Sequence, residues 1–391
     1  MRATKKQLEN IKKKYGVDTL WSWSKYHTYK EDPYSWMLKY IRHEKEKKSS
    51  IYAVSGGNCH QIIEDFYNKK ISYEDMINEY EDKLMEMNLA ELKYNRKDDK
   101  ANKITADKYE GCIREFFKHH VPIKGKVITE QFVTIKVGKN IFQGYIDFLH
   151  KENGKYIITD WKTSSRYVGE KAKKECGQLV LYAESLIQRG VALEDIKIRW
   201  NFLKYCDIEY QLKGIDKITK LNKTKVTVGE RNKWVEKIKN NLKMWLKEDG
   251  KEELEIEDMV QTAINNNNLD NIPLHIKSRY KISDCYGYID LNKQIIEDLK
   301  EDIIDTINKI KEKERDYNIY MEQGEEDEAE HLFWTIIDDK NSFFFNNLCG
   351  FSTKQHKPYK EYLDDLKMWV LKDKENEKES VEDDMDWLND L

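Results

Sequence analysis

The sequence predicts a mixed α/β protein, in which a central mixed β-sheet is flanked by helices and carries large helical N-terminal and C-terminal additions. Gly (17) and Pro (4) are scarce among 391 residues, which is typical of much helix and few long loops. Apolar residues recur with helical spacing over most of the first 125 residues and again beyond residue 229. Between these regions the apolar pattern becomes that of strands, so we expect the sheet there.

The strands are expected in a stretch rich in Ile, Val, Phe and Tyr. Gly138-Lys139 and Asn153-Gly154 divide this stretch into three consecutive strands at residues 127–137, 140–150 and 155–162. The order of these strands predicts a meander.

A helix and a further strand follow the meander. Leu179, Tyr182 and Leu186 lie on one stripe of a helix expected over 171–189, and the pattern of residues 196–205 is that of a strand. A helix between two strands predicts a crossover connection onto the same sheet.

The remaining helices are expected on both sides of this segment. Asp32-Pro33 is typical of an N-cap followed by proline at the first helical position. Ser55-Gly56-Gly57-Asn58 is expected to break the chain before the next helix. The expected helices cover residues 5–45, about 60–67, 73–93, 103–119, 229–248 and 293–322.

We expect the chain to consist of four consecutive parts. A mainly helical N-terminal region (1–125) precedes a core that contains the sheet (126–228). A helical C-terminal region (229–372) then leads to an acidic flexible tail (373–391), which is too charged to join a core.

Composition argues against several classes of protein. No apolar run approaches the length needed to span a bilayer, and the N-terminus lacks the apolar stretch of a signal peptide, so we expect a cytoplasmic protein without a membrane partner. The six cysteines are scattered singly without a CxxC pair, which indicates neither a zinc site nor a disulfide framework. The net charge of −4 does not exclude a nucleic-acid partner, because the tail is strongly acidic and basic clusters lie elsewhere.

Two aspartates and a lysine form the central candidate site. Asn153-Gly154 favours a two-residue type I′ hairpin, because both residues adopt positive φ with little strain. That register places Asp147 opposite Asp160, and the two-residue period of a strand places Lys162 on the same face. Like charges across a sheet destabilise it by up to roughly 1 kcal/mol, and a divalent cation held between the carboxylates would remove the repulsion.

A second interpretation of these residues is a solvated strand face, with Lys162 as a surface counter-charge. Exposed strands usually alternate with polar residues, whereas both aspartates lie in strongly apolar strands, GYIDFL and YIITDWK. The apolar surroundings favour a chemical site.

The segment GYIDFLHKENGKYIITDWKTSS resembles the central signature of PD-(D/E)XK nucleases of the RecB-type branch. The resemblance implies a restriction-endonuclease-like sheet and phosphodiester hydrolysis with Mg²⁺ or Mn²⁺, with residues 126–228 as the nuclease core. Carried over by position, Asp147 and Asp160 become catalytic metal ligands. The backbone carbonyl of Trp161 becomes a further ligand, and Lys162 becomes the catalytic lysine that positions or deprotonates the attacking water.

Two further segments resemble motifs of the same branch. In Gly56-Gly57-Asn58-Cys59-His60 the resemblance implies that the histidine reaches the metal, and Glu64, one helical turn later, either orients that imidazole or is solvated. Gln178 and Tyr182 resemble a Q-x-x-x-Y motif on the helix after the lysine strand. This motif implies contact with the DNA backbone or support for the metal site, and packing in the core is the alternative.

Two C-terminal segments concern cofactors and partners. Some members of the branch carry an iron–sulfur cluster, and FFFNNLCGFSTK resembles part of that site but keeps only Cys349, so no cluster is expected. The tail, which ends in DDMDWLNDL, is a docking peptide for a protein partner, a mimic of DNA phosphate or a solubilising terminus.

The resemblance implies a metal-dependent DNA nuclease, with exonuclease activity in DNA recombination, replication or repair. The bias toward Lys, Asn, Ile and Tyr suggests a phage or a bacterium with AT-rich DNA, and a phage protein would act in the host cytoplasm. The alternative is a catalytically silent nucleic-acid-binding or scaffold subunit of a recombination or replication complex. The intact set of His60, Asp147, Asp160 and Lys162 argues against that alternative.

Overall fold

The computed structural model describes residues 3–352 and 354–370, and the expected acidic tail at 373–391 lies outside the described residues. The chain forms two compact units, each built from two separate stretches of sequence. The first unit runs to Trp21 and resumes with Tyr52–Glu301, and the second comprises Ser22–Ile51 and the chain from Asp302 onward. The four consecutive parts expected from the sequence stay a prediction, because the units follow contacts between distant segments rather than chain order.

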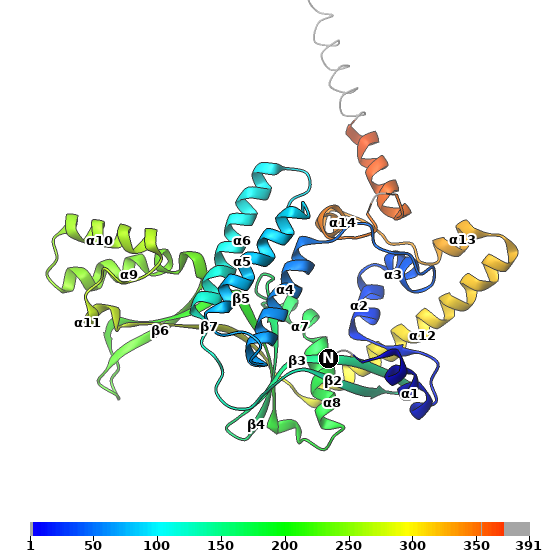
Figure 1. Ribbon diagram of the computed structural model, residues 1–391, viewed down its shortest axis with the longest axis horizontal. Coiled ribbons are helices and arrows are strands. Elements are labelled where there is room, and N and C mark those ends of the chain that lie inside the picture. Colours follow the sequence, from blue (N-terminus) through cyan, green and yellow to red (C-terminus); the bar gives the residue numbers. More distant parts are fainter. Residues whose placement is uncertain (1–2, 353, 371–391) are drawn as a thin grey trace, which may run out of the picture. The chain divides into compact units, whose positions relative to one another are not determined.

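The first unit contains a seven-stranded mixed sheet (Figure 1). Five strands lie side by side in the order β2, β3, β4, β5 and β7. Strand β1 pairs with the part of β3 that does not pair with β4. Strand β6 pairs with the part of β5 that extends beyond β4. The strands are β1 (Leu20–Trp21), β2 (Val127–Val137), β3 (Asn140–Glu152), β4 (Lys155–Lys162), β5 (Ile196–Ile215), β6 (Asn222–Glu230) and β7 (Tyr280–Ile289).

Helices make up most of the rest of both units. Those of the first unit are α1 (Lys5–Tyr15), α4 (Ile51–Tyr67), α5 (Asp75–Leu89), α6 (Asp99–His119), α7 (Glu170–Glu175), α8 (Gly177–Ile187), α9 (Trp234–Glu248), α10 (Glu253–Asn266) and α11 (Leu274–Lys277). The second unit contains α2 (Trp23–Glu31), α3 (Pro33–Tyr40), most of α12 (Lys293–Gln323), α13 (Glu326–His331), α14 (Ser342–Asn347) and a helix over residues 357–370. Among the described residues, no helix combines the length and the apolar character needed to cross a membrane.

The predicted meander is confirmed. Strands β2, β3 and β4 are consecutive antiparallel neighbours with bounds close to those expected. Asn153 (φ 48°) and Gly154 (φ 82°) form the turn between β3 and β4, and pairing continues to Phe148↔Thr159 in the register that the turn predicts. The predicted crossover is also confirmed, because β4 and β5 are parallel and α7 and α8 connect them.

The expected break at Ser55-Gly56-Gly57-Asn58 is wrong, because these residues lie inside α4. A methyl group on Gly56 would lie 3.5 Å from the hydroxyl oxygen of Thr163, just after β4. Ser55 and Cys59, one turn apart on α4, are completely buried. Small residues here let the helix pack closely beside the end of β4, and this packing outweighs the low helix propensity of glycine.

The sequence pattern does not predict β1, β6 or β7. Strand β1 has two residues, too few for a periodicity, and it interrupts the helix expected over 5–45. Strands β6 and β7 contain Lys, Asn, Ser and Asp and extend by pairing with β5, a partner that their local sequence does not reveal. The predicted start of a helix at Asp32-Pro33 is confirmed, because Asp32 caps α3.

Helices cover both faces of the sheet in the first unit. Trp161 of β4 lies against Phe116 of α6 and Phe148 of β3, and Phe148 lies against Tyr67 of α4. Helices α4 and α6 therefore cover this face, whereas α8 packs against β2, β4 and β5 on the other side of the strands (Figure 1). Strand alternation directs Asp160 away from the Trp161 face.

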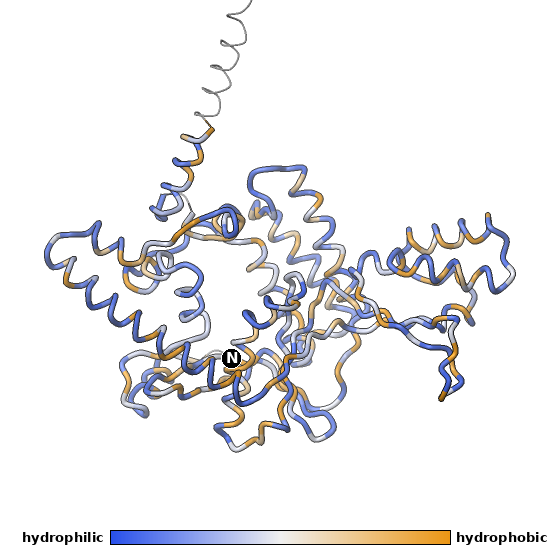
Figure 2. The backbone as a smooth tube through the Cα atoms, turned by 180° about the vertical axis from the view of Figure 1, so that it is seen from behind, coloured by the Kyte–Doolittle hydropathy of each residue, from blue (hydrophilic) through white to orange (hydrophobic). Residues whose placement is uncertain are grey.

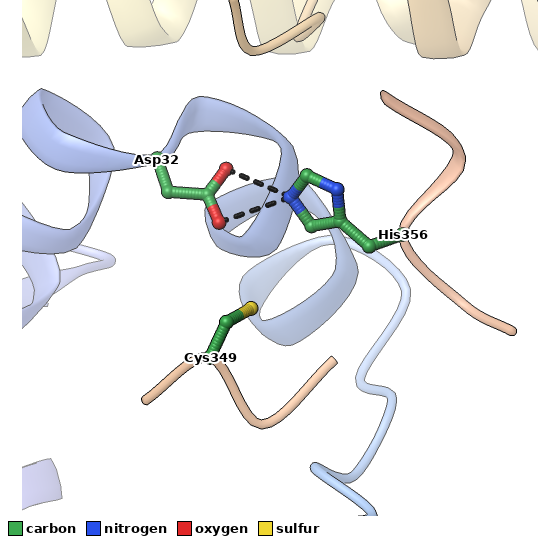
Figure 3. Close-up of side chains that lie close together, drawn as sticks. All are labelled: Asp32, Cys349 and His356. Atoms are coloured by element: carbon green, nitrogen blue, oxygen red, sulfur yellow. Dashed lines mark hydrogen bonds and ion pairs between the residues drawn. The ribbon is translucent and has the colours of Figure 1, made fainter. Parts of the chain in front are cut away.

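A buried aspartate joins the two stretches of the second unit (Figure 3). Asp32 caps α3 by accepting a bond from the backbone N–H of Ser35 (3.2 Å), and its carboxylate also accepts bonds from the hydroxyls of Ser35 and Thr335. Nε2 of His356 lies 3.1 and 3.2 Å from the two carboxylate oxygens, and its Nδ1 caps the helix over 357–370 by accepting a backbone N–H. The caps of two helices that are distant in sequence are thereby bonded to each other.

We expect Asp32→Ala to destabilise the second unit. Burial alone would raise the pKa of Asp32, but the bonds from His356, Ser35 and Thr335 outweigh burial and lower the pKa. The charged carboxylate therefore contributes stability above the unfolded pKa of about 3.9, and this contribution is lost as the pH falls through the lower folded-state pKa. Its removal at neutral pH should cost about 2–5 kcal/mol.

Hydrogen exchange of the amides of α3 and of residues 357–370 checks this expectation at pH 7 and pH 3. Asp32→Ala should exchange faster than the wild type at pH 7, and the difference should be smaller at pH 3. Asp305→Ala, at an exposed position on α12, is the matched control and should change neither. Equal exchange of wild type and Asp32→Ala at pH 7 would show that the carboxylate contributes no stability.

Candidate functional site

The site lies where two strands of the meander separate. The ladder between β3 and β4 ends at Phe148↔Thr159, and the next positions in the same register are Asp147 and Asp160. Beyond this point β4 continues only against β5, as far as Lys162↔Phe202, while β1 joins β3 further along. The two aspartates therefore lie at a fork in the sheet, as the hairpin register predicts.

The lysine predicted on the same face is in contact with one aspartate. Nζ of Lys162 lies 2.8 Å from Oδ2 of Asp160. The side chain of Asp160 is 5% exposed, whereas that of Lys162 is 27% exposed and reaches solvent. Burial alone would lower the pKa of Lys162, but Asp160 raises it more, so the net pKa is above its ordinary value. Lys162 is an ammonium ion at neutral pH.

His60 links α4 to both carboxylate strands. Its Nε2 lies 2.6 Å from the backbone oxygen of Trp161, and its Nδ1 lies 3.5 Å from Oδ2 of Asp147. A carbonyl oxygen only accepts hydrogen bonds, so Nε2 carries the proton and the Nδ1 lone pair of the neutral ring faces Asp147. Burial lowers the pKa of His60 and favours this neutral form, against the smaller opposing effect of Asp160. An imidazole oriented in this way by a backbone carbonyl is prepared for metal ligation.

Three side chains of this site have the donor set of a metal centre. One ligand atom each from His60, Asp147 and Asp160 lies within 4.8 Å of the other two. Burial raises the pKa of Asp147 well above its ordinary value, and the charge and hydrogen bond of Asp160 raise it further. The ammonium group of Lys162 offsets only part of this repulsion, and a cation between the two carboxylates would remove it.

A small cavity of about 10 Å³ lies among these residues. Its volume is close to the minimum for one water-sized body. His60 and Asp147 line it, together with Glu64 and Glu130. Both ring nitrogens of His60 face groups other than Glu64. The Oε1 atom of Glu64 instead accepts a hydrogen bond from Asn68 (3.3 Å), and the Glu64 carboxylate forms part of the cavity wall.

Glu130 is an acidic residue of the site that the sequence analysis did not single out. It lies between the pairs Thr129↔Phe148 and Gln131↔Ile146, and so opposite Asp147, and its negative charge raises the pKa of Asp147. Its φ of 49° is left-handed, which costs a non-glycine residue roughly 1–3 kcal/mol and persists only where the surroundings enforce it. The two-residue turn at Gly138-Lys139 sets this register, so the same argument that paired Asp147 with Asp160 could have found Glu130.

The helix after β4 brings its predicted pair together. Nε2 of Gln178 donates to the hydroxyl of Tyr182 (3.2 Å), and the Tyr182 side chain is almost completely buried. Burial raises the pKa of Tyr182 to about 12, and Asp147 and Asp160 are among the smaller causes. The tyrosine ring lies against Gly144 of β3, where a Cβ atom would come within 2.9 Å of it. Glycine at this position lets α8 approach the carboxylate strands.

A second group of metal-binding residue types lies in the other unit. Asp32, Cys349 and His356 also have ligand atoms within 4.8 Å of one another (Figure 3). Nδ1 of His356 accepts a backbone N–H, so Nε2 carries the ring proton and directs it at Asp32. The ring nitrogens of His356 and the carboxylate of Asp32 are therefore hydrogen-bonded within the protein. Burial raises the pKa of the Cys349 thiol to about 11, so this thiol is protonated at neutral pH. The expectation that no iron–sulfur cluster forms stays a prediction.

The fold and this group of residues define the class of protein. A mixed sheet that gathers two carboxylates, an imidazole and an ammonium group at one fork has the donor set of a divalent-metal-dependent hydrolase. The sequence model of the PD-(D/E)XK nuclease superfamily matches residues 20–265, and the chain belongs to this superfamily. The predicted superfamily and the restriction-endonuclease-like mixed sheet are thus confirmed. No curated protein matches the chain.

We expect the stability of the metal-free protein to depend on Asp147 and pH. A folded-state pKa above the unfolded value means that Asp147 contributes stability at pH values below its unfolded pKa of about 3.9 and loses that contribution as the pH rises through the folded pKa. Asp147→Asn removes a charge from the pair and should therefore stabilise the metal-free protein at pH 8 by up to roughly 1 kcal/mol.

Thermal unfolding in EDTA at pH 5 and pH 8 measures this effect. The gain from Asp147→Asn should be larger at pH 8, and Asp195→Asn, at an exposed position, should give no gain at either pH. Mn²⁺ at 100 times its dissociation constant should stabilise the wild type by about 2.7 kcal/mol and the Asp147 variant much less. An Asp147→Asn gain that does not increase with pH would contradict the assignment of a repelled pair.

Proposed function

We propose that this protein is a metal-dependent deoxyribonuclease that hydrolyses phosphodiester bonds of DNA. The observation that carries the proposal is the carboxylate pair at the β3–β4 fork, with the Nδ1 lone pair of His60 on one side and the ammonium group of Lys162 on the other. Membership of a nuclease superfamily supports the reaction class. A solvated strand face does not account for an aspartate with only 5% of its side chain exposed.

His60, Asp147 and Asp160 are the proposed metal ligands, with Mg²⁺ or Mn²⁺ as the cofactor. The backbone oxygen of Trp161 stays a proposed ligand, and in the structure it accepts the bond from His60. When bound, the metal supplies a Lewis acid for the phosphoryl oxygen and lowers the pKa of water. Mg²⁺ prefers oxygen ligands, so the imidazole of His60 should favour Mn²⁺ over Mg²⁺.

Lys162 is the proposed catalytic lysine. Of the two roles implied by the resemblance, positioning the attacking water agrees better with its raised pKa than deprotonating that water does. An ammonium group donates hydrogen bonds but accepts none, and it can also stabilise negative charge that develops on the phosphate. Asp160 holds this ammonium group at the site through its 2.8 Å contact.

Other residues of the site are proposed to support the metal ligands. Glu64 and Glu130 add negative charge to the cavity wall. Gln178 and Tyr182 are proposed to hold the DNA backbone or to support the metal site, and the burial of Tyr182 against Gly144 favours support.

Exonuclease action in DNA recombination, replication or repair is proposed by analogy with the RecB-type branch, as are a phage origin and the host cytoplasm. The alternative function is a catalytically silent nucleic-acid-binding or scaffold subunit. The proposed protein partner of the acidic tail concerns residues outside those that the structure describes.

We expect Asp160→Ala and Lys162→Met to abolish DNA cleavage. Loss of a metal ligand should remove several kcal/mol of transition-state stabilisation, roughly 10³-fold or more in rate. Loss of the lysine should cost on the order of 10²–10³-fold. The measurement uses end-labelled linear DNA, closed circular DNA and single strands, each with Mg²⁺ and with Mn²⁺. Degradation that requires a free end would identify an exonuclease.

The matched controls are Asp195→Asn, an exposed aspartate, and Lys155→Met, at the opposite end of β4 from Lys162. Both should cleave like the wild type. Equal cleavage by the wild type and by both site variants would overturn the proposal. A wild type that binds Mn²⁺ and DNA but cleaves no substrate would support the silent subunit instead.

A further inference from the structure

Strands β5 and β6 form a hairpin that extends beyond the rest of the sheet. Strand β7 pairs with β5 only as far as Tyr210↔Tyr280, whereas β6 accompanies β5 to Ile215↔Asn222. The outer part, residues 212–225, is therefore a two-stranded ribbon except at Lys225, whose partner Tyr210 also pairs with β7, and Figure 1 shows it projecting beside α11. We call this part the arm.

The base of the arm is firmly attached. The backbone oxygen of Gln211 accepts hydrogen bonds from Asn241 and Trp245 of α9, both at 3.1 Å. Below it, Ile208 of β5 belongs to an apolar cluster that includes Leu242 and Leu246 of the same helix. These contacts with α9 hold the base of the arm in place and therefore fix the direction in which the ribbon extends.

The arm is strongly basic in a chain whose net charge is −4. It contains five lysines and a single acidic residue, Asp216, a net charge of +4 from five minus one. Asp216 is occupied within the loop, where it accepts backbone bonds from Ile218 and Thr219 (2.9 and 2.8 Å). Lys213 pairs with Glu248. The other four lysines, which are exposed, form no ion pair with any residue that the structure describes: Lys217, Lys220, Lys223 and Lys225.

The tip of the arm exposes aliphatic side chains among these lysines. Ile218 is 90% exposed, and Leu221 is 69% exposed. Figure 2 shows hydrophobic positions between hydrophilic ones along this ribbon. Large aliphatic residues at such exposure gain no burial energy within the chain, and side chains of this kind contact sugars or wedge against bases in proteins that bind DNA grooves.

We propose that the arm binds double-stranded DNA at a distance from the cleavage site. The arm and a polyanion are complementary in charge, and a two-stranded β-ribbon has the width of the major groove. The inference rests on the proposed DNA substrate, and it adds a second contact that the carboxylate fork does not supply. Lysines on an edge strand also hinder aggregation, but that role alone would leave DNA affinity unchanged.

Strand β5 fixes the reach of this contact. Phe202 of β5 pairs with Lys162 at the fork, and the same strand continues to Lys213 and then to Ile218 in the loop. At about 3.3 Å per residue, the arm spans roughly 36–53 Å from the fork at most. Duplex DNA rises about 3.4 Å per base pair, so the arm should contact DNA at most roughly 11–16 base pairs from the scissile bond.

The test is equilibrium binding of the full chain in EDTA, where metal-dependent cleavage is silent. Fluorescence anisotropy is measured with labelled duplexes of 8, 16 and 30 base pairs and a 30-nucleotide single strand, over 50–300 mM salt. The arm variant is K217Q/K220Q/K223Q/K225Q, the tip variant is I218S/L221S, and the matched control with four other exposed lysines is K97Q/K100Q/K139Q/K197Q.

We expect the arm variant to bind the 30-base-pair duplex at least about tenfold more weakly at 100 mM salt. Its slope of log K against log salt should fall by up to about 3.6, four contacts at about 0.9 each. The tip variant should lose affinity without losing slope, and the control should stay within about twofold of the wild type. The 8-base-pair duplex is too short to reach from the fork to the arm, so the gain in affinity from 8 to 30 base pairs should be smaller for the arm variant than for the wild type.

Three results would overturn the proposal: an arm variant with wild-type affinity and slope, a control that loses as much, or a loss confined to the single strand. Binding of the wild type to anionic vesicles that the arm variant loses, with DNA affinity unchanged, would instead assign the arm to a membrane surface. The cleavage assay separates this proposal from the nuclease proposal, because either can fail while the other stands.

Discussion

The repulsion between Asp147 and Asp160 is the constraint around which the first unit is organised. A two-residue turn places both carboxylates at the same level of neighbouring strands, and burial strengthens the repulsion instead of screening it. Lys162 compensates one charge, and the neutral ring of His60 adds none. The other face of the same strands is buried and aromatic, with Trp161 and Phe148 packed under α4 and α6, so burial there offsets the repulsion at the fork.

Sequence reasoning succeeded where the determining chemistry is local. Asn153-Gly154 determines its own turn, the turn determines the register, and the register brings Asp147, Asp160 and Lys162 together without knowledge of the rest of the chain. The proximity of His60 followed only from resemblance, because α4 and β4 are far apart in sequence.

The predictions that were wrong or missing also have a physical cause, because each feature depends on a contact between segments that are distant in sequence. The segment that contains Gly56 was expected to break the chain before a helix, yet Gly56 makes close packing near Thr163 possible, a contact that local propensity cannot reveal. Strand β6 is too rich in lysine to be recognised as a strand and exists because β5 pairs with it. The bond between Asp32 and His356 joins opposite ends of the chain, and no local pattern predicts such a pair.

The division of the chain into interleaved units has a consequence for biosynthesis. Asp32 leaves the ribosome before its partner His356, which follows 324 residues later. At about 5–20 residues per second, Asp32 waits roughly 16–65 s for that partner, whereas the stretch that forms the nuclease sheet is completed in between. The nascent protein should therefore expose the unfinished stretch Ser22–Ile51 throughout translation of the first unit, and this stretch is where a chaperone would be needed.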